Sequence, residues 1–234
     1  MKLLVSDYDL TFNSIDYDVW INKHFVKQFR DNGNLFFLNT GRSYESIKKE
    51  IDKFRINFDY LGCCDGNLIL NKNLEIVYCT SLPSTILENL QSLKKDDTKF
   101  SCDAVTYQGK ILEYVVMMYE NDDGFSDRLN EFGNNNGLTV KNFKKLIFHK
   151  FKLKRGNYFY LGKDDISKSS AISIVSELEN ISRCDIFTIG DHLNDLEMIK
   201  DFNGYTLPWG KKEVKDVSQG KVLSVSSLVK KIMR

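Results

Sequence analysis

The chain has 234 residues, 42% of them hydrophobic and 28% charged, which is ordinary for a soluble globular protein with room for one large domain or a core with a small second unit. Its 33 basic and 32 acidic residues leave a net charge of +1, so no global field points to nucleic acid or an anionic membrane as a partner. No apolar stretch is long enough to span a bilayer, and an acid at position 7 comes too early for a signal peptide.

The first third of the chain alternates strand and helix patterns. Short apolar runs and segments with helical spacing predict strands at 2–6, 35–39 and 60–64 and helices at 19–31 and 44–54. A hairpin over 68–79 is expected to follow. Strands separated by helices predict a parallel sheet with right-handed crossovers.

The pattern changes near Leu82 and changes back after Gly162. Between them we expect strands joined by hairpins, which indicates a separate α+β unit: a helix at 85–95, strands at 100–107 and 110–119, a helix at 127–134, and further strand at 140–153 and 158–161. The alternating type then returns, with a helix at 167–179, a strand at 185–189, a helix from Asp195, a strand near 205–207 and a helix near 227–233. We therefore predict an α/β core domain, 1–81 and 162–234, with an inserted α+β domain, 82–161.

The cysteines indicate a reducing compartment. The five are odd in number and include no Cys-x-x-Cys pair. We expect reduced, buried cysteines and a cytoplasmic location.

Polar segments follow three of the apolar runs: 7–11 (Asp-Tyr-Asp-Leu-Thr), 39–42 (Asn-Thr-Gly-Arg) and 190–195 (Gly-Asp-His-Leu-Asn-Asp). In an open parallel sheet, residues just past the carboxyl ends of the strands gather at one edge, where ligands bind. Acidic groups crowded there repel one another unless a cation lies among them. A metal-assisted phosphoryl-transfer site is the leading interpretation.

The first segment holds a candidate nucleophile and a candidate acid. Asp7 would attack the phosphorus and form an aspartyl-phosphate, and Asp9 would protonate the leaving alcohol and then activate water. The alternative is a solvated turn, since Asp-x-Asp near a strand end is common. Asp16-Tyr17-Asp18 repeats the tripeptide without a preceding strand, and we interpret it as the acidic start of a helix.

The third segment would complete a magnesium site. Mg²⁺ prefers oxygen ligands and keeps several waters, so one or two carboxylates and a phosphate suffice. We expect Asp191 to bind Mg²⁺ directly together with Asp7, and the backbone carbonyl of Asp9 to be a third ligand. Asp195 would bind through water or orient its neighbours. Alternatively, Asn194 and Asp195 only cap the following helix.

Other residues would hold the phosphate. Thr40 and Gly41 offer a hydroxyl and a backbone N–H at the start of the helix that follows. Arg42 is a candidate substrate contact, although an exposed salt bridge explains it equally well. Lys168 could neutralise the nucleophile and the phosphate, and Asn194 is assigned to the phosphate with them.

The set of four motifs resembles the haloacid dehalogenase (HAD) superfamily, specifically its Cof-type phosphatases with an inserted C2-type cap. The family's Asp-x-Asp-x-Thr stands here as 7–11 and its Thr-Gly-Arg as 40–42. Its lysine after the cap fits Lys168, and its Gly-Asp-x-x-Asn-Asp stands as 190–195. All four occur in order and span the whole chain.

The resemblance implies a magnesium-dependent phosphatase with a Rossmann-like core and a cap between the second and third motifs. Asp9 matters most for reaction type, because dehalogenase relatives lack this second acid. Two departures concern the substrate: Leu10 replaces the usual glycine, and Asp65-Gly66-Asn67 stands where relatives often carry Asn-Gly-Ala. A compact cap leaves room for a small phosphorylated metabolite such as a sugar phosphate.

Three alternative functions remain open from the sequence. A phosphomutase or phosphotransferase would use the same aspartyl-phosphate and exclude water. A signalling receiver domain also carries a phospho-aspartate, although the insertion and Thr40-Gly41 argue against it. A catalytically dead binding module would not need both acid pairs. We expect a monomer or homodimer without nucleic-acid or membrane partners.

Overall fold

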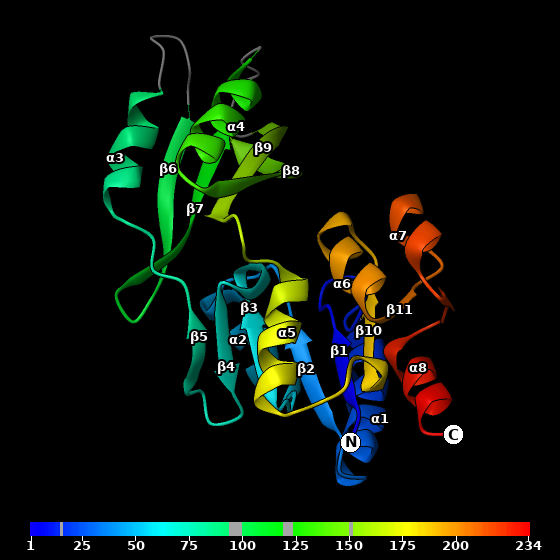
Figure 1. Ribbon diagram of the computed structural model, residues 1–234. Helices are drawn as coiled ribbons and strands as arrows, with labels where there is room; N and C mark the ends of the chain where they lie inside the picture. The colour runs from blue at the N-terminus through cyan, green and yellow to red at the C-terminus, as the bar shows by residue number, and fades with distance from the viewer. Residues whose placement is uncertain (15, 94–99, 119–123, 150–151) are drawn as a thin grey trace. The chain divides into compact units, whose positions relative to one another are not determined.

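The computed structural model describes residues 1–14, 16–93, 100–118, 124–149 and 152–234. Their contacts divide the chain into two compact units: Met1–Tyr78 with Ile166–Arg234, and Cys79–Asp165. The first holds a mainly parallel sheet between helices and the second a four-stranded antiparallel sheet (Figure 1). The predicted α/β fold with an α+β insertion is confirmed. The expected domain bounds stay a prediction, because contacts alone do not show which segments fold independently.

The larger unit is built on eight strands: β1 (Leu3–Ser6), β2 (Leu35–Asn39), β3 (Tyr60–Cys63), β4 (Leu68–Asn71), β5 (Ile76–Cys79), β10 (Ile186–Gly190), β11 (Asn203–Thr206) and β12 (Gly220–Lys221). Their order across the sheet is β12-β11-β10-β1-β2-β3-β4-β5. The pairs from β12 to β3 are parallel, and β4 is antiparallel to β3. Strand β1 therefore lies in the middle of the parallel part, between β10 and β2.

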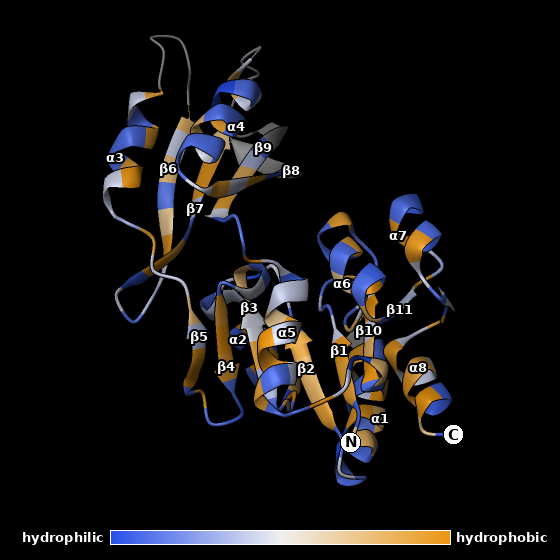
Figure 2. Ribbon diagram, in the orientation of Figure 1, coloured by the Kyte–Doolittle hydropathy of each residue, from blue (hydrophilic) through white to orange (hydrophobic). Residues whose placement is uncertain are grey.

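Helices cover both faces of this sheet: α1 (Asp16–Asp31), α2 (Tyr44–Phe54), α5 (Lys168–Leu178), α6 (Leu196–Asp201), α7 (Lys212–Val217) and α8 (Val225–Ile232). Successive side chains of a strand point to opposite faces. Leu3 and Val5 accordingly pack in one core cluster with Ile172 of α5 and Met198 of α6, while Leu4 is fully buried outside that cluster. Strands β2 and β4 are largely apolar in Figure 2, as expected when both faces are covered.

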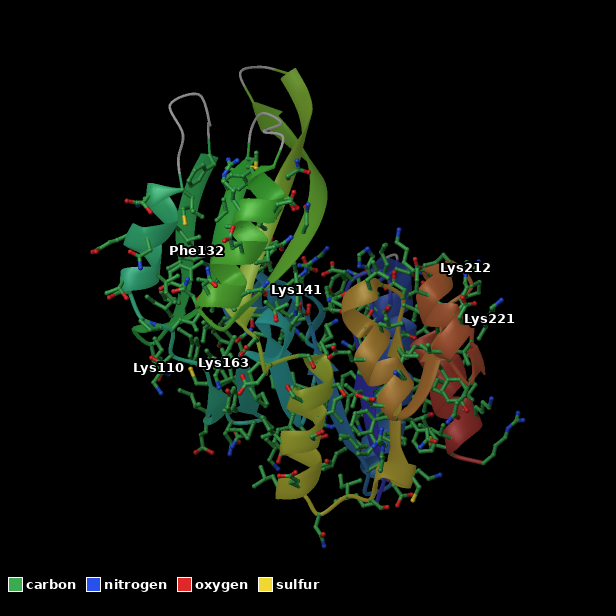
Figure 3. The ribbon with its side chains drawn as sticks, turned by 45° about the horizontal axis from the view of Figure 1, so that its top comes forward. Lys110, Phe132, Lys141, Lys163, Lys212 and Lys221 are labelled. Atoms are coloured by element: carbon green, nitrogen blue, oxygen red, sulfur yellow. The ribbon has the colours of Figure 1, made fainter. Side chains whose placement is uncertain are left out.

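The described residues of the inserted unit form two helices and four strands: α3 (Thr85–Ser92), β6 (Phe100–Tyr107), β7 (Lys110–Met118), α4 (Phe125–Asn135), β8 (Leu138–His149) and β9 (Lys152–Lys163). Its strand order is β6-β7-β9-β8, with antiparallel neighbours. Leu90 of α3 and Leu129 of α4 pack with Tyr114 and Phe159 in its own core. Figure 3 shows Lys110 and Lys163, the residues at which β7 begins and β9 ends.

Several predicted elements need correction. The further strand expected at 140–153 and 158–161 divides differently: β8 ends at His149, which pairs with Lys152 at the start of β9, and residues 150–151 lie outside the described part. The residues between them include no Gly, Pro, Asn or Asp to mark a turn. Helix α1 begins at Asp16 and not at position 19, and the short elements α7 and β12, which carry Lys212 and Lys221 in Figure 3, were not predicted. The predicted ends at positions 95 and 119 lie outside the described residues.

No helix within the described part of the chain has the length and apolar character needed to cross a membrane.

Candidate active site

The loops that follow three parallel strands leave the larger sheet at one level. Ser6 at the end of β1 pairs with Ile189 of β10 on one side and with Leu38 of β2 on the other. Asp7 comes next, and its backbone N–H donates to the carbonyl of Ile189 at 3.0 Å. The segments that follow β1, β2 and β10 therefore begin side by side at the carboxyl edge of the sheet.

A fully buried lysine joins two of these segments. Lys168 is the first residue of α5, whose N-cap is Ser167, and its side chain is 0% exposed. Its Nζ donates to Oδ1 of Asp7 at 2.6 Å and to Oδ1 of Asp195 at 2.7 Å. Lysine is almost never fully buried unless it is paired. Helix α5 thus delivers one positive charge between two carboxylates.

The segment after β10 holds two acids, Asp191 and Asp195, whose carboxylates accept different numbers of hydrogen bonds. Oδ2 of Asp195 accepts the backbone N–H groups of Asp191 at 2.9 Å and His192 at 3.0 Å, and its Oδ1 accepts the lysine. Both oxygens of Asp195 are therefore engaged within the protein. Asp191 accepts only one side-chain hydrogen bond from the described residues, to Oδ1 from the Thr11 hydroxyl at 2.8 Å.

Three buried carboxylates, those of Asp7, Asp191 and Asp195, form one group. One oxygen from each lies within 4.8 Å of the others. Burial raises the pKa of the Asp7 carboxyl well above its usual value, and its acidic neighbours add to that effect while Lys168 opposes it. Burial also raises the pKa of Asp191. The ionised forms of both acids are therefore disfavoured without a further cation.

The lysine responds to the same charges in the opposite direction. Burial alone would lower the pKa of the Lys168 ammonium, but the carboxylates of Asp195, Asp7 and Asp65 outweigh burial and raise it. Lys168 is thus held positively charged. One ammonium cannot neutralise three ionised carboxylates, so a further cation would favour ionisation of all three acids.

The donor set fits a hard divalent cation. Asp7 and Asp191 each use Oδ1 in a hydrogen bond, and Oδ2 of each has no hydrogen-bond partner among the described residues. Carboxylate oxygens at separate positions suit a cation that completes its shell with water. Asp195, with both oxygens engaged, is better placed to orient its neighbours. The group could hold a metal ion.

The turn after β2 is braced by the segment after β3. The backbone N–H of Asp65 donates to the Thr40 carbonyl at 3.1 Å, and that of Cys64 donates to the Arg42 carbonyl at 2.9 Å. A Cβ on Gly41 would lie 3.0 Å from Oδ1 of Asp65 and 3.5 Å from Nδ2 of Asn194. Position 41 therefore has little room for a side chain. The Thr40 hydroxyl accepts a hydrogen bond from the Arg42 backbone N–H at 3.2 Å.

Asp9 and Arg42 form a separate ion pair. Arg42 Nε and one terminal nitrogen donate to the two oxygens of Asp9 at 2.8 and 2.6 Å. The Asp9 side chain is 53% exposed and does not belong to the group of three buried acids. The hydrogen bond to Asp9 raises the pKa of the Arg42 guanidinium. The structure therefore places these two candidates together, apart from the buried carboxylates.

The residue between Asp9 and Thr11 adopts an unusual backbone. Leu10 has φ of 57°, in the left-handed region that favours glycine, and its side chain is exposed. Its carbonyl accepts the Trp209 indole N–H at 2.9 Å. This geometry explains why a glycine would suit the position.

Sequence reasoning missed two contributors. Thr11 was quoted only as part of a motif, but its hydroxyl fixes Asp191. Asp65 accepts Nδ2 of Asn194 at 2.9 Å, which ties a predicted phosphate ligand to the end of β3. The signal was available, because Asp65 follows a parallel strand just as Asp7 does.

Comparison with known proteins shows which family the chain belongs to. The family model described as "haloacid dehalogenase-like hydrolase" matches residues 5–151 and 138–225 of the chain. The chain belongs to the haloacid dehalogenase-like hydrolases. Its fold is shared with a phosphatase of this superfamily from Bacteroides thetaiotaomicron, at 15% identity and a TM-score of 0.77, over 100% of this chain and 94% of that one.

Two further structures, a Cof-like hydrolase and a sugar phosphatase, share the fold of this chain. A candidate HAD/COF-like hydrolase from Plasmodium vivax is 15% identical with a TM-score of 0.69, over 100% of this chain and 95% of that one. A subclass IIB sugar phosphatase is 12% identical with a TM-score of 0.72, over 100% and 98%. At such identities the likeness shows the fold alone. The inserted unit of this HAD-like hydrolase is the cap.

Proposed function

We propose that the protein is a magnesium-dependent hydrolase of small phosphate monoesters that acts through an aspartyl-phosphate on Asp7. The observation that carries the proposal is the group of Asp7, Asp191 and Asp195 around the buried Lys168. In this proposal one edge of the sheet supplies the nucleophile (Asp7), the positive charge that offsets it (Lys168) and the ligands for a cation (Asp7 and Asp191).

The reaction would run in two steps. A carboxylate oxygen of Asp7 attacks phosphorus, the bond from phosphorus to the ester oxygen breaks, and Asp9, which enters this step protonated, gives its proton to the leaving alcohol and becomes a carboxylate. Water then attacks the aspartyl-phosphate, Asp9 takes its proton, and inorganic phosphate leaves with Asp7 restored. Lys168 remains protonated throughout and offsets the charge on Asp7.

The remaining residues would bind rather than react. Mg²⁺, held by Asp7, Asp191 and the backbone carbonyl of Asp9, would screen the charge of the phosphate. Asp195 would orient the Asp191 segment through its two backbone hydrogen bonds. Thr40, Gly41 and Asn194 would hold the phosphate oxygens.

For the substrate we propose a small phosphorylated metabolite, with a sugar phosphate as the leading class. One of the solved structures that share this fold is a sugar phosphatase, which supports that class. A phosphomutase or phosphotransferase would share the first step and deliver the phosphoryl group to an acceptor hydroxyl. A receiver domain would accumulate the phosphorylated form.

The function is tested by offering the purified protein a panel of phosphorylated metabolites and p-nitrophenyl phosphate. We expect inorganic phosphate to be released with Mg²⁺ and not with EDTA. Transfer to a sugar hydroxyl without phosphate release would favour the mutase, and a long-lived phosphoprotein would favour the receiver. No phosphate chemistry on any ester would contradict the proposal.

Asp9→Asn is expected to slow the hydrolysis of phosphate esters, and to slow it more where the leaving group is more basic. Loss of a proton donor typically costs ~10²–10⁴-fold, and it costs more where the leaving oxygen is more basic. We expect a loss of that order in kcat/KM on phenyl phosphate and a smaller one on p-nitrophenyl phosphate. Equal kcat/KM for variant and wild type on phenyl phosphate would remove Asp9 from the acid role.

A further inference from the structure

We propose that Arg42 is a positioning residue that holds the Asp9 carboxylate in place, in contrast to the phosphate contact expected from the sequence. The inference rests on the proposed function, because it assigns Arg42 a task in the step that uses Asp9.

The pair has the geometry of a clamp. Both carboxylate oxygens of Asp9 are held, at 2.6 and 2.8 Å, by two nitrogens on one side of the planar guanidinium. Such bidentate contacts fix direction as well as distance. No other described side chain hydrogen-bonds to the Asp9 carboxylate, which is 53% exposed and would otherwise sample several rotamers.

Arg42 is itself held from behind. Its remaining nitrogen faces Oε1 of Glu50 at 3.6 Å, and its guanidinium lies over the ring of Tyr8 at 5.0 Å. The Tyr8 hydroxyl donates to Oε2 of Glu50 at 3.0 Å and accepts Nδ2 of Asn13 at 3.1 Å. Each guanidinium nitrogen thus faces a carboxylate within this network, which connects α2 to the turn after β1.

These contacts favour a role through Asp9. All three guanidinium nitrogens of Arg42 face the carboxylates of Asp9 or Glu50. An acid must lie within hydrogen-bond reach of the leaving oxygen to transfer its proton, and small misplacements are costly. Arg42 therefore acts on the reaction through Asp9.

The test is Arg42→Lys, which keeps the charge and removes the fork. We expect kcat/KM on phenyl phosphate to fall roughly 10- to 100-fold and to fall much less on p-nitrophenyl phosphate. The inhibition constant for inorganic phosphate should stay within about twofold, since the charge near the anion is unchanged. The double variant Asp9→Asn, Arg42→Lys should lose no more than Asp9→Asn alone.

Arg30 provides a matched control. It binds Asp59 through two nitrogens at 2.7 Å each, and Asp59 precedes β3 at the opposite edge of the sheet. Arg30→Lys should leave both esters unaffected. If Arg42→Lys is inhibited less by phosphate and loses kcat/KM equally on the two esters, Arg42 is a phosphate ligand. If the double variant loses more kcat/KM than Asp9→Asn alone, the inference is also overturned. If wild type releases phosphate from no ester of the metabolite panel, the proposed function fails; if it does and only the Arg42→Lys signature is missing, this inference alone fails.

Discussion

Asp7→Asn is expected to reduce phosphate release to below about a ten-thousandth of the wild-type rate while the protein stays folded. The amide has the shape of the carboxylate but cannot form the aspartyl-phosphate, and loss of a covalent nucleophile is among the most severe changes an enzyme can suffer. The rate is measured with the best ester of the panel under saturating Mg²⁺. Asp216→Asn, the same change on the exposed surface of α7, should have wild-type activity.

Thermal unfolding of the same variant separates lost chemistry from lost structure. Because the pKa of the Asp7 carboxyl is raised in the folded state, ionised Asp7 opposes folding at neutral pH. Metal-free Asp7→Asn should therefore unfold at the wild-type temperature or above it. Mg²⁺ at 100 times its dissociation constant should stabilise wild type by about 2.7 kcal/mol and the variant by less. Retained activity would contradict the nucleophile assignment, and equal stabilisation by Mg²⁺ would contradict the metal assignment.

Apolar runs were enough to predict the core of the fold. Strands β1, β2 and β10 are mostly apolar and almost entirely buried, and the helices between them have clear caps such as Ser43 and Ser167. Parallel strands in that order require the three polar segments that follow them to lie at one edge of the sheet. The pairing of β8 with β9 was missed, because the sequence between His149 and Lys152 contains no Gly, Pro, Asn or Asp.

The hydrogen-bond partners of the side chains at the site could not be predicted in the same way. The sequence placed Asp7, Asp191, Asp195 and Lys168 at one edge, and the structure brings the four together. Local patterns could not show that Asp195 uses both oxygens in internal hydrogen bonds, or that Arg42 turns toward Asp9. Such choices depend on tertiary distances that no local pattern encodes.

Lys168→Met is expected to destabilise the metal-free protein by about 3–5 kcal/mol at pH 8. Methionine fills the space of the lysine stem but leaves Asp7 and Asp195 buried and close together without their shared cation. The free energy of unfolding is measured by urea denaturation. Lys48→Met, which removes an exposed pair with Asp52, should leave the free energy of unfolding almost unchanged.

The pH dependence of this loss tests its cause. In the folded variant the pKa of Asp7 should rise further than in wild type, because burial persists while the opposing lysine is gone. The folded state then binds more protons than the unfolded state, so its stability falls as pH rises and recovers as pH falls toward 5. A deficit of the same size at pH 5 and pH 8 would indicate a packing defect, and wild-type stability at pH 8 would show that the buried lysine does not hold these acids together.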